Sequence, residues 1–247
     1  MMEEFIDTFT SKVGSAEVAV LLPVHNEVHA IENVILEFYN AIGSKIPLEI
    51  VLSEDGSTDG TKEVIKRLSK EVPLKALLSP MRKGYAQGII DGLNYVMSDY
   101  VLITDSDGQH DPQDFWKLWE MRKEYDIVSG WRVKRADSLQ RKVMSKTFQF
   151  MAKKLFGLPN FKDITAPFKL IRTEVAREIA SEYKYMRESF WTEFTIRAYK
   201  KGFKIVEVPA THRPRLDGST RVYKPWKIPK IVISQSYALL KLWGELR

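Results

Sequence analysis

The chain has 247 residues, of which 44% are hydrophobic and 28% are charged. This composition is that of a globular protein and excludes a disordered or fibrous one. The absence of cysteine excludes disulfides and thiolate metal sites, and the net charge of +6 selects no single class of partner.

The N-terminal residues, MMEEFIDTFTSK, are acidic where a signal peptide would be basic. The sequence also contains no unbroken run of about 18 apolar residues, the length that predicts a membrane-spanning helix. Together with the missing cysteines, these features predict a cytoplasmic protein.

From Val18 to Tyr100, short apolar runs rich in branched residues alternate with longer amphipathic stretches. This alternation predicts βα units, and therefore an α/β fold with a mostly parallel sheet and helices on both faces. We expect strands at 18–22, 48–53, 74–79 and 100–104, each followed by a helix, at 28–42, 60–70, 84–97 and 112–124. Further along, we expect strands at 126–129, 168–171 and 203–208 and helices at 139–156, 173–182 and 191–201.

The C-terminal segment has a different composition from the rest of the chain. We expect one domain over residues 1–222 and a separate amphipathic helix within 223–247, where Trp226, Tyr237 and Trp243 accompany a stripe of Leu, Ile and Val and several lysines. Such a helix can lie in a membrane interface. Docking of the helix on the core of the domain is an equally open interpretation.

Polar residues follow the predicted strands at the edge where open α/β sheets bind ligands. After the second strand come Glu54 and Asp55, in a glycine-containing turn. A carboxylate there can accept hydrogen bonds from a ribose or a base, so Asp55 is a candidate nucleotide ligand. After the third strand, Lys83 precedes Gly84 at a predicted helix start, which suits a phosphate or a ribose.

The fourth predicted strand is followed by the sequence Asp105-Ser106-Asp107-Gly108-Gln109. In an extended chain, two residues that are two apart point to the same side. Two carboxylates held close together repel each other unless a cation lies between them. Because Mg²⁺ and Mn²⁺ prefer oxygen ligands, Asp105, Asp107 and the amide oxygen of Gln109 are candidate ligands for either ion.

Several motifs occur in an order that resembles one family. Residues 23–27 are similar to its opening P-x-x-N-E loop, 54–61 to its D-D-G-S-x-D-x-T segment, and 105–110 to D-A-D-L-Q-H. Residues 129–132 stand where the family has a G-S-R step, and 213–221 resemble its R-x-x-G-x-S-K loop. From about residue 18 to 222, the chain resembles the family-two glycosyltransferases of GT-A fold, in the branch similar to dolichol-phosphate mannose synthase.

The resemblance implies a role for individual residues, and it makes 1–222 a catalytic domain. The nucleotide-sugar site would be lined by Pro23, Asn26, Glu27, Glu54, Asp55, Lys83, Asp105 and Ser106. Mg²⁺ or Mn²⁺ would be held by Asp105, Asp107 and Gln109. The catalytic set would be Asp107, Arg132, Glu193, Arg213 and Arg221, with the arginines beside the phosphates of donor and acceptor.

The implied function is metal-dependent, inverting sugar transfer from a nucleoside diphosphate sugar, either GDP-mannose or a UDP-hexose, to a polyprenyl or dolichyl phosphate. We expect the protein at the cytoplasmic face of a membrane, touched through the C-terminal segment, and we expect no nucleic-acid partner. Two positions depart from the family pattern: Glu54 replaces the first aspartate of its pair, and Pro167 replaces a glycine.

The acceptor is the open part of this interpretation. A lipid phosphate is already anionic and needs no protein base, whereas a sugar hydroxyl needs a carboxylate within hydrogen-bond reach. Glu193 is the candidate base, but Phe194 stands where family members that act on hydroxyls have an aspartate. Phe194, together with basic residues such as Arg215, favours a lipid phosphate.

Two other classes of protein remain as alternatives. A strand followed by D-x-D-G also opens haloacid dehalogenase-type phosphohydrolases, but these have Thr after the glycine and a late acidic pair. This chain has Gln109 after the glycine and no two adjacent acids after Asp111. The second alternative is a non-catalytic module that binds nucleotide sugars, against which the full set of carboxylates and arginines argues.

Overall fold

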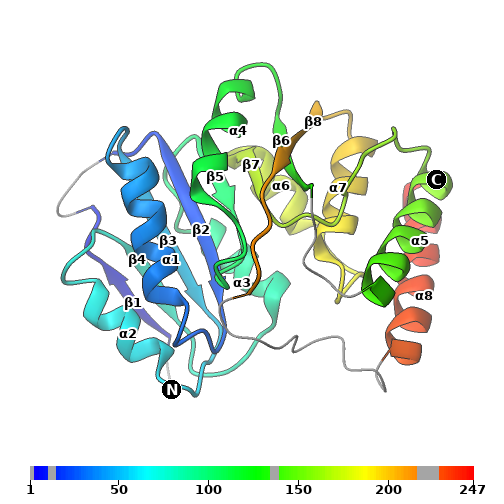
Figure 1. The fold of residues 1–247 in the computed structure, drawn as a ribbon. Coiled ribbons are helices and arrows are strands. Elements are labelled where there is room, and N and C mark those ends of the chain that lie inside the picture. Colours follow the sequence, from blue (N-terminus) through cyan, green and yellow to red (C-terminus); the bar gives the residue numbers. More distant parts are fainter. Residues whose placement is uncertain (1–2, 11–14, 134–138, 216–227) are drawn as a thin grey trace.

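The structure is a computed structural model that describes residues 3–10, 15–133, 139–215 and 228–247, without the side chains of 139–143 and 228–230. Within these residues the strands form one eight-stranded sheet, in the order β1-β4-β3-β2-β5-β7-β6-β8. Helices cover both faces of the sheet, and α5 and α8 lie together at one end of the molecule (Figure 1).

The strands are β1 (Glu4–Asp7), β2 (Val18–Val24), β3 (Leu48–Glu54), β4 (Lys75–Leu78), β5 (Tyr100–Ile103), β6 (Ile127–Arg132), β7 (Lys169–Arg172) and β8 (Ile205–Ala210). The α-helices are α1 (Ile31–Phe38), α2 (Thr61–Leu68), α3 (Tyr85–Leu93), α4 (Phe115–Met121), α5 (Leu139–Phe156), α6 (Thr173–Ser181), α7 (Phe190–Lys200) and α8 (Ile228–Leu246). A π-helical turn, η1 (Tyr39–Gly43), extends α1, and a 3₁₀ turn, η2 (Pro112–Asp114), precedes α4.

The sheet is mostly parallel, and the predicted fold class is confirmed. β4, β3, β2 and β5 pair in parallel, and so do β6 and β8. β1 is antiparallel to β4, and β7 is antiparallel to both of its neighbours, β5 and β6. Because β2, β3 and β5 are parallel, the loops after them meet at one edge of the sheet.

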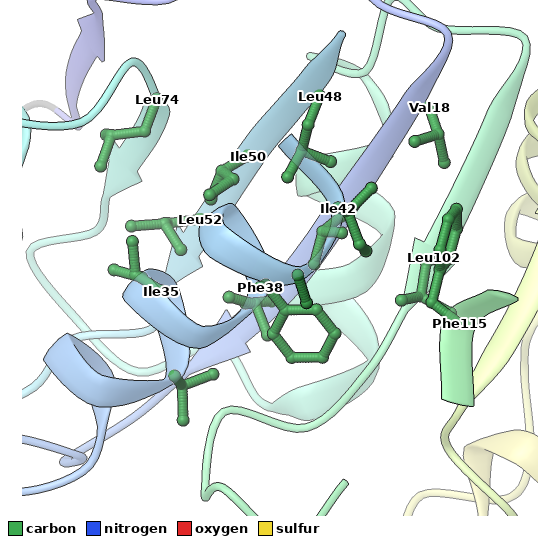
Figure 2. Close-up of a cluster of buried hydrophobic side chains, with 14 of the residues drawn as sticks. Val18, Ile35, Phe38, Ile42, Leu48, Ile50, Leu52, Leu74, Leu102 and Phe115 are labelled. Carbon is green, nitrogen blue, oxygen red and sulfur yellow. The ribbon is translucent and has the colours of Figure 1, made fainter. Parts of the chain in front are cut away.

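Alternate side chains of β2 enter cores on opposite faces of the sheet, as strand geometry requires. Val18, Val20 and Leu22 pack with α1, η1, α2 and α4 in the larger cluster, part of which Figure 2 shows. Ala19 and Leu21 pack with α3, α6 and α7 on the other face. Every residue of β2 is buried, so the strand is held in register from both sides.

Helix α3 lies close to the sheet because a glycine faces it. A Cβ at Gly92 would collide with Cδ1 of Leu21 and approach Cβ of Ser53 within 3.3 Å. This close packing holds the last turn of α3 against β2 and β3.

A third cluster joins α8 to the rest of the molecule. Leu239 and Leu242 of α8 pack with Phe156 of α5, Ile196 of α7 and Met186. One face of the C-terminal helix is therefore docked on the protein. The predicted boundary at 222/223 lies outside the described residues, so the division into domains stays a prediction. None of the helices in the described part of the chain is long and apolar enough to cross a membrane.

Candidate active site

The loop that follows β2 is tied to the loop that follows β3. Asn26 has a positive φ of 56°, a conformation that asparagine tolerates better than most residues. Its backbone N–H donates to Ser57 Oγ at 2.8 Å, and its side-chain oxygen accepts from the backbone N–H of Thr58 at 2.8 Å. The Asn26 side chain thus holds two strand-end loops together.

Two glutamates near these loops, Glu27 and Glu54, are buried, and each has a basic partner. Glu54 accepts a short hydrogen bond from the backbone N–H of Ser57, and Lys62 Nζ lies 3.6 Å from its other oxygen. Glu27 forms an ion pair with Arg215. Both predicted nucleotide-site glutamates therefore lie at the strand-end edge, each with a basic partner.

Asp55 organises the start of α3. Its two oxygens accept hydrogen bonds from the backbone N–H groups of Lys83, at 2.5 Å, and Gly84, at 2.9 Å. The glycine at position 56 has a φ of +65°, and a Cβ there would collide with the backbone of Met81. Asp55 and Gly56 thus bring the loop after β4 against the loop after β3.

The ammonium group of Lys83 faces other carboxylates. It contacts Asp91, and it lies 2.5 Å from Glu3 Oε1. Burial lowers the pKa of Lys83, but the hydrogen bonds to Asp91 and Glu3 outweigh burial and raise it above its usual value. The backbone N–H of Lys83 thus bonds to Asp55 in the site, whereas its ammonium group bonds to Asp91 and Glu3.

The aspartates after β5 lie at the centre of this edge. Between them, Ser106 is buried and donates its hydroxyl to the carbonyl oxygen of Pro23 at 2.9 Å, which pins the segment to β2. Burial, followed by the charge of Asp107, raises the pKa of Asp105 to about 6. The negative charge of Asp107 thus disfavours the ionised form of Asp105.

The residues present fit a hard divalent cation. A cation placed between Asp105 and Asp107 would remove their repulsion, and both are oxygen donors. Gln109 lies beside them: its backbone N–H donates to Asp107 Oδ1 at 3.1 Å, and its amide nitrogen donates to the carbonyl oxygen of Arg213 at 3.2 Å. In the described residues no group of three or more His, Asp or Glu could hold a metal, so a cation here would depend on phosphate and water for the rest of its shell.

Each described arginine of the predicted catalytic set has an acidic partner. Arg132 makes a two-pronged pair with Asp163, at 2.7 and 3.1 Å, and its charge lowers the pKa of Asp105. Arg213 pairs with Glu37 at 2.8 Å and with Asp111 at 3.0 Å. Arg221 lies outside the described residues.

A further arginine, Arg215, lies beside Asp107. Its Nε lies 3.9 Å from Asp107 Oδ2 while its Nη2 pairs with Glu27. The set of site residues predicted from the sequence did not include it, although it counted among the basic residues of the acceptor side. The segment of basic residues pointed to it, but spacing alone could not separate Arg213 from Arg215.

Glu193 has a structural environment. It is fully buried and accepts hydrogen bonds from the backbone N–H groups of Lys184, Tyr185 and Met186, at 3.0, 2.9 and 2.8 Å. It also pairs with Arg197, one helical turn away, at 2.8 Å. Because its oxygens hold the turn that precedes α7, the geometry gives no support to a role as general base.

Sequence reasoning missed two aromatic residues at the site, Tyr85 and Trp191. The hydroxyl of Tyr85 donates to Asp105 Oδ1 at 2.7 Å and accepts from Trp191 Nε1 at 2.8 Å. These three residues are far apart in the sequence, so no motif indicated their contact.

Solved structures share this fold at low sequence identity. One is the mannosyltransferase PcManGT from Pyrobaculum calidifontis in complex with GDP-Man and Mn²⁺, with a TM-score of 0.63, 18% identity and coverage of 92% of this chain and 64% of that one. Another is glucosyl-3-phosphoglycerate synthase from Mycobacterium tuberculosis in complex with Mn²⁺, uridine-diphosphate-glucose and phosphoglyceric acid, with a TM-score of 0.66, 16% identity and coverage of 96% and 82%. The fold is that of the GT-A glycosyltransferases.

Residues 19–180 match the family described as Glycosyl transferase family 2, and the chain belongs to that family. A dolichol-phosphate mannosyltransferase of Pyrococcus furiosus is 29% identical over 239 residues, which cover 93% of this chain and 65% of that protein. An undecaprenyl-phosphate 4-deoxy-4-formamido-L-arabinose transferase of Pectobacterium carotovorum is 29% identical over 209 residues, which cover 83% and 62%. The chain therefore spans less than two thirds of the length of these relatives.

Proposed function

We propose that this protein is a metal-dependent, inverting glycosyltransferase that moves a sugar from a nucleoside diphosphate sugar to a polyprenyl phosphate. The observation that carries the proposal is the pair Asp105 and Asp107, two residues apart after the carboxyl end of β5, with Arg215 Nε 3.9 Å from Asp107 Oδ2. Two carboxylates and a guanidinium at this edge suit a cation and a diphosphate.

On the donor side, Asp105, Asp107 and the amide of Gln109 would hold Mg²⁺ or Mn²⁺. When bound, the cation would neutralise the negative charge that develops on the departing diphosphate. Arg132 is fixed by Asp163 and Thr165, and such pre-set donors stabilise developing charge without having to reorganise. The loops that Asn26 and Asp55 organise would form the nucleotide pocket.

On the acceptor side, two arguments favour a lipid phosphate over a sugar hydroxyl. An anionic phosphate oxygen attacks without a protein base, and Glu193, the candidate base, is occupied by three backbone N–H groups and Arg197. The relatives named as dolichol-phosphate and undecaprenyl-phosphate transferases point to the same acceptor class. Membership of the family rules out the haloacid dehalogenase alternative. Measured turnover would distinguish an enzyme from a non-catalytic module that binds nucleotide sugars.

The membrane contact that the proposed acceptor requires would come from α5 and α8. Between them lies a groove of about 490 Å³, lined by Phe150, Met151, Lys154, Leu155, Ser236, Leu239 and Leu240. Further apolar side chains of α8 are exposed, among them Ile233, 71% exposed, and Tyr237, 60% exposed. Exposed apolar residues on adjacent helices are typical of an interaction surface.

The charge of this surface favours an anionic lipid bilayer as the partner. The described residues of α5 include Lys146, Lys153 and Lys154 and no acid, and Lys241 lies on α8. Glu245, the acid among the described residues of α8, is paired with Arg197 and Lys184. Basic amphipathic helices bind anionic membrane surfaces in this way. The expected cytoplasmic side of the membrane stays a prediction.

The test offers purified protein a panel of GDP- and UDP-sugars, a polyprenyl phosphate and either Mn²⁺ or Mg²⁺, followed by extraction into organic solvent. We expect one donor to give an organic-soluble sugar product, and we expect EDTA to abolish it. Parallel reactions use free sugars as acceptors. A product formed only with free sugars would overturn the lipid-phosphate acceptor, and a product formed in EDTA would overturn the metal requirement.

A further inference from the structure

The first residue of α3 reaches across the site to the first aspartate after β5. Tyr85 Oη donates a hydrogen bond to Asp105 Oδ1 at 2.7 Å, and Trp191 Nε1 donates to Tyr85 Oη at 2.8 Å. An indole N–H can only donate. The phenol oxygen is therefore the acceptor in the second bond, and its single hydrogen is directed to Asp105.

The phenol is held in place by both halves of the sheet. After β3, Asp55 accepts from the backbone N–H of Gly84, the residue before Tyr85. From α7, Phe190 meets the Tyr85 ring edge-on, with centroids 6.3 Å apart. Trp191 follows Phe190 in α7 and is itself 5% exposed. Phe190 and Trp191 are buried in the core, whereas Tyr85 is 37% exposed and is held by its two hydrogen bonds and by the Phe190 ring.

The indole ring also has a fixed environment behind it. Lys169 Nζ, from β7, lies 5.6 Å from the centroid of the Trp191 ring. The same ammonium donates to Ser129 Oγ of β6 at 2.5 Å. Trp191 thus lies beside an ammonium group that is itself anchored between β6 and β7.

We propose that Tyr85, oriented by Trp191, is a positioning residue that fixes the carboxylate of Asp105 for the cation and the donor nucleotide. Tyr85 takes Oδ1, so Asp105 presents Oδ2 to the ligand. Without this bond, repulsion from Asp107 would turn the Asp105 side chain away. The inference rests on the proposed function, because it assigns a role in the same donor site.

The test compares Tyr85→Phe with the unaltered protein by calorimetric titration, first with Mn²⁺ alone and then with Mn²⁺ and GDP or UDP. The variant keeps the ring and loses only the hydroxyl. We expect Mn²⁺–nucleotide binding to weaken about tenfold, the size of a hydrogen bond to a charged group. In the transfer assay, we expect the apparent KM for the donor to rise and that for the acceptor to stay unchanged.

Two further variants separate positioning from general structure. Tyr95→Phe, near the Phe5 ring and away from the aspartates, is the matched control and should bind as the unaltered protein does. Trp191→Phe should weaken binding about threefold, and the double variant should bind no more weakly than Tyr85→Phe alone, since both changes act through one bond.

Binding by Tyr85→Phe equal to that of the unaltered protein would overturn the positioning role and leave the proposed function standing. Additive losses in the double variant would also overturn it, because they would show that Trp191 acts independently of Tyr85. If the unaltered protein binds neither GDP nor UDP with Mn²⁺, the proposed function fails and the inference fails with it.

Discussion

Asp107 accepts a hydrogen bond from the backbone N–H of Gln109 and lies near Arg215 and Asp105. Replacing it with alanine removes a proposed metal ligand and also one of two repelling charges. We expect Asp107→Ala to lower metal-dependent transfer roughly 100-fold or more, because charge stabilisation on the leaving group is lost. Thermal unfolding should show a melting temperature that is unchanged or higher.

The matched control for Asp107→Ala is Asp99→Ala, an exposed aspartate just before β5 at the other end of the strand. It should transfer sugar normally. Full activity of Asp107→Ala would remove the metal assignment.

Substitution of Glu193 tests whether its carboxylate has a structural or a catalytic role. Its bonds to three backbone N–H groups and to Arg197 predict that Glu193→Gln lowers the free energy of unfolding by about 2–3 kcal/mol. The transfer rate per folded molecule should change only a few-fold. Urea unfolding and steady-state kinetics measure the two effects separately, and Glu188→Gln, an exposed neighbour, is the control.

The opposite result would support Glu193 as the general base. If Glu193→Gln keeps its stability and loses several orders of magnitude in rate, Glu193 acts in the chemical step and the acceptor is a hydroxyl.

At the residue scale, sequence reasoning worked where chemistry follows from position along one strand. Asp105 and Asp107 lie two and four residues after the end of β5, and Asp55 directly follows β3, as expected from apolar runs that end in acids. The partners of these residues were not predictable. Lys83 turned toward Asp91 and Glu3, and Tyr85 toward Asp105, because side-chain direction depends on helices that pack from elsewhere in the chain.

At the scale of elements, α8 is held by an ion-pair cluster as well as by packing. Glu245 near its end pairs with Arg197 of α7 at 2.8 Å and accepts from Tyr185 Oη at 2.6 Å. Bonds from Arg197 and Tyr185 hold the pKa of Glu245 at about 2, below its usual value of 4.5. A carboxyl with a depressed folded-state pKa stabilises the fold above its unfolded pKa, and this contribution is lost as the pH falls toward 2.

We therefore expect Glu245→Gln to lower the free energy of unfolding by about 1–2 kcal/mol at pH 7, after allowance for solvent screening. The difference from the unaltered protein should narrow as the pH falls from about 4.5 toward 2. Urea unfolding at a series of pH values measures it, with the exposed Glu124→Gln as control. A difference that stays constant down to pH 3 would mean that Glu245 does not stabilise α8 through its charge.

The positions of most elements were predictable, and their exact forms were not. The strands expected at 18–22, 48–53 and 100–104 lie at 18–24, 48–54 and 100–103, because continuous branched apolar runs are typical of buried parallel strands. β1 was missed, since its four residues are mostly exposed and carry no apolar alternation. The helix expected over 28–42 is α1 followed by a π-helical turn, a local change that hydrophobic spacing does not encode.

At the scale of the whole molecule, the surface of α5 and α8 gives a prediction about membranes. Phe150, 59% exposed, lines the groove from α5, and Ile233, 71% exposed, lies on α8. We expect the double variant Phe150→Ser/Ile233→Ser to lose most of its sedimentation with anionic vesicles, because burial of apolar side chains and attraction of lysines act together. Binding by the unaltered protein should fall with added salt.

Met97→Ser, at a methionine that is 76% exposed on the loop after α3, is the matched control. Retained binding by the double variant would overturn the membrane surface. A dimer that dissociates on the same double substitution would assign the surface to a second copy of the chain.

The order of the sheet was the feature of the whole molecule that sequence reasoning could not supply. A parallel sheet followed from the βα rhythm, but β7 enters antiparallel between β5 and β6, although both precede it in the chain. Strand pairing of this kind depends on contacts across the sheet. The short apolar run at β7 does not indicate which strands it pairs with.

The late placement of β7 also governs how this chain can be built during synthesis. β5 and β6 do not pair with each other, so each keeps an open edge until residues 169–172 have left the ribosome. Unpaired strand edges are templates for wrong association. The nascent chain therefore passes through a stage in which β6 cannot yet join the sheet at β5, because the four-residue strand β7 that pairs with both has not been made.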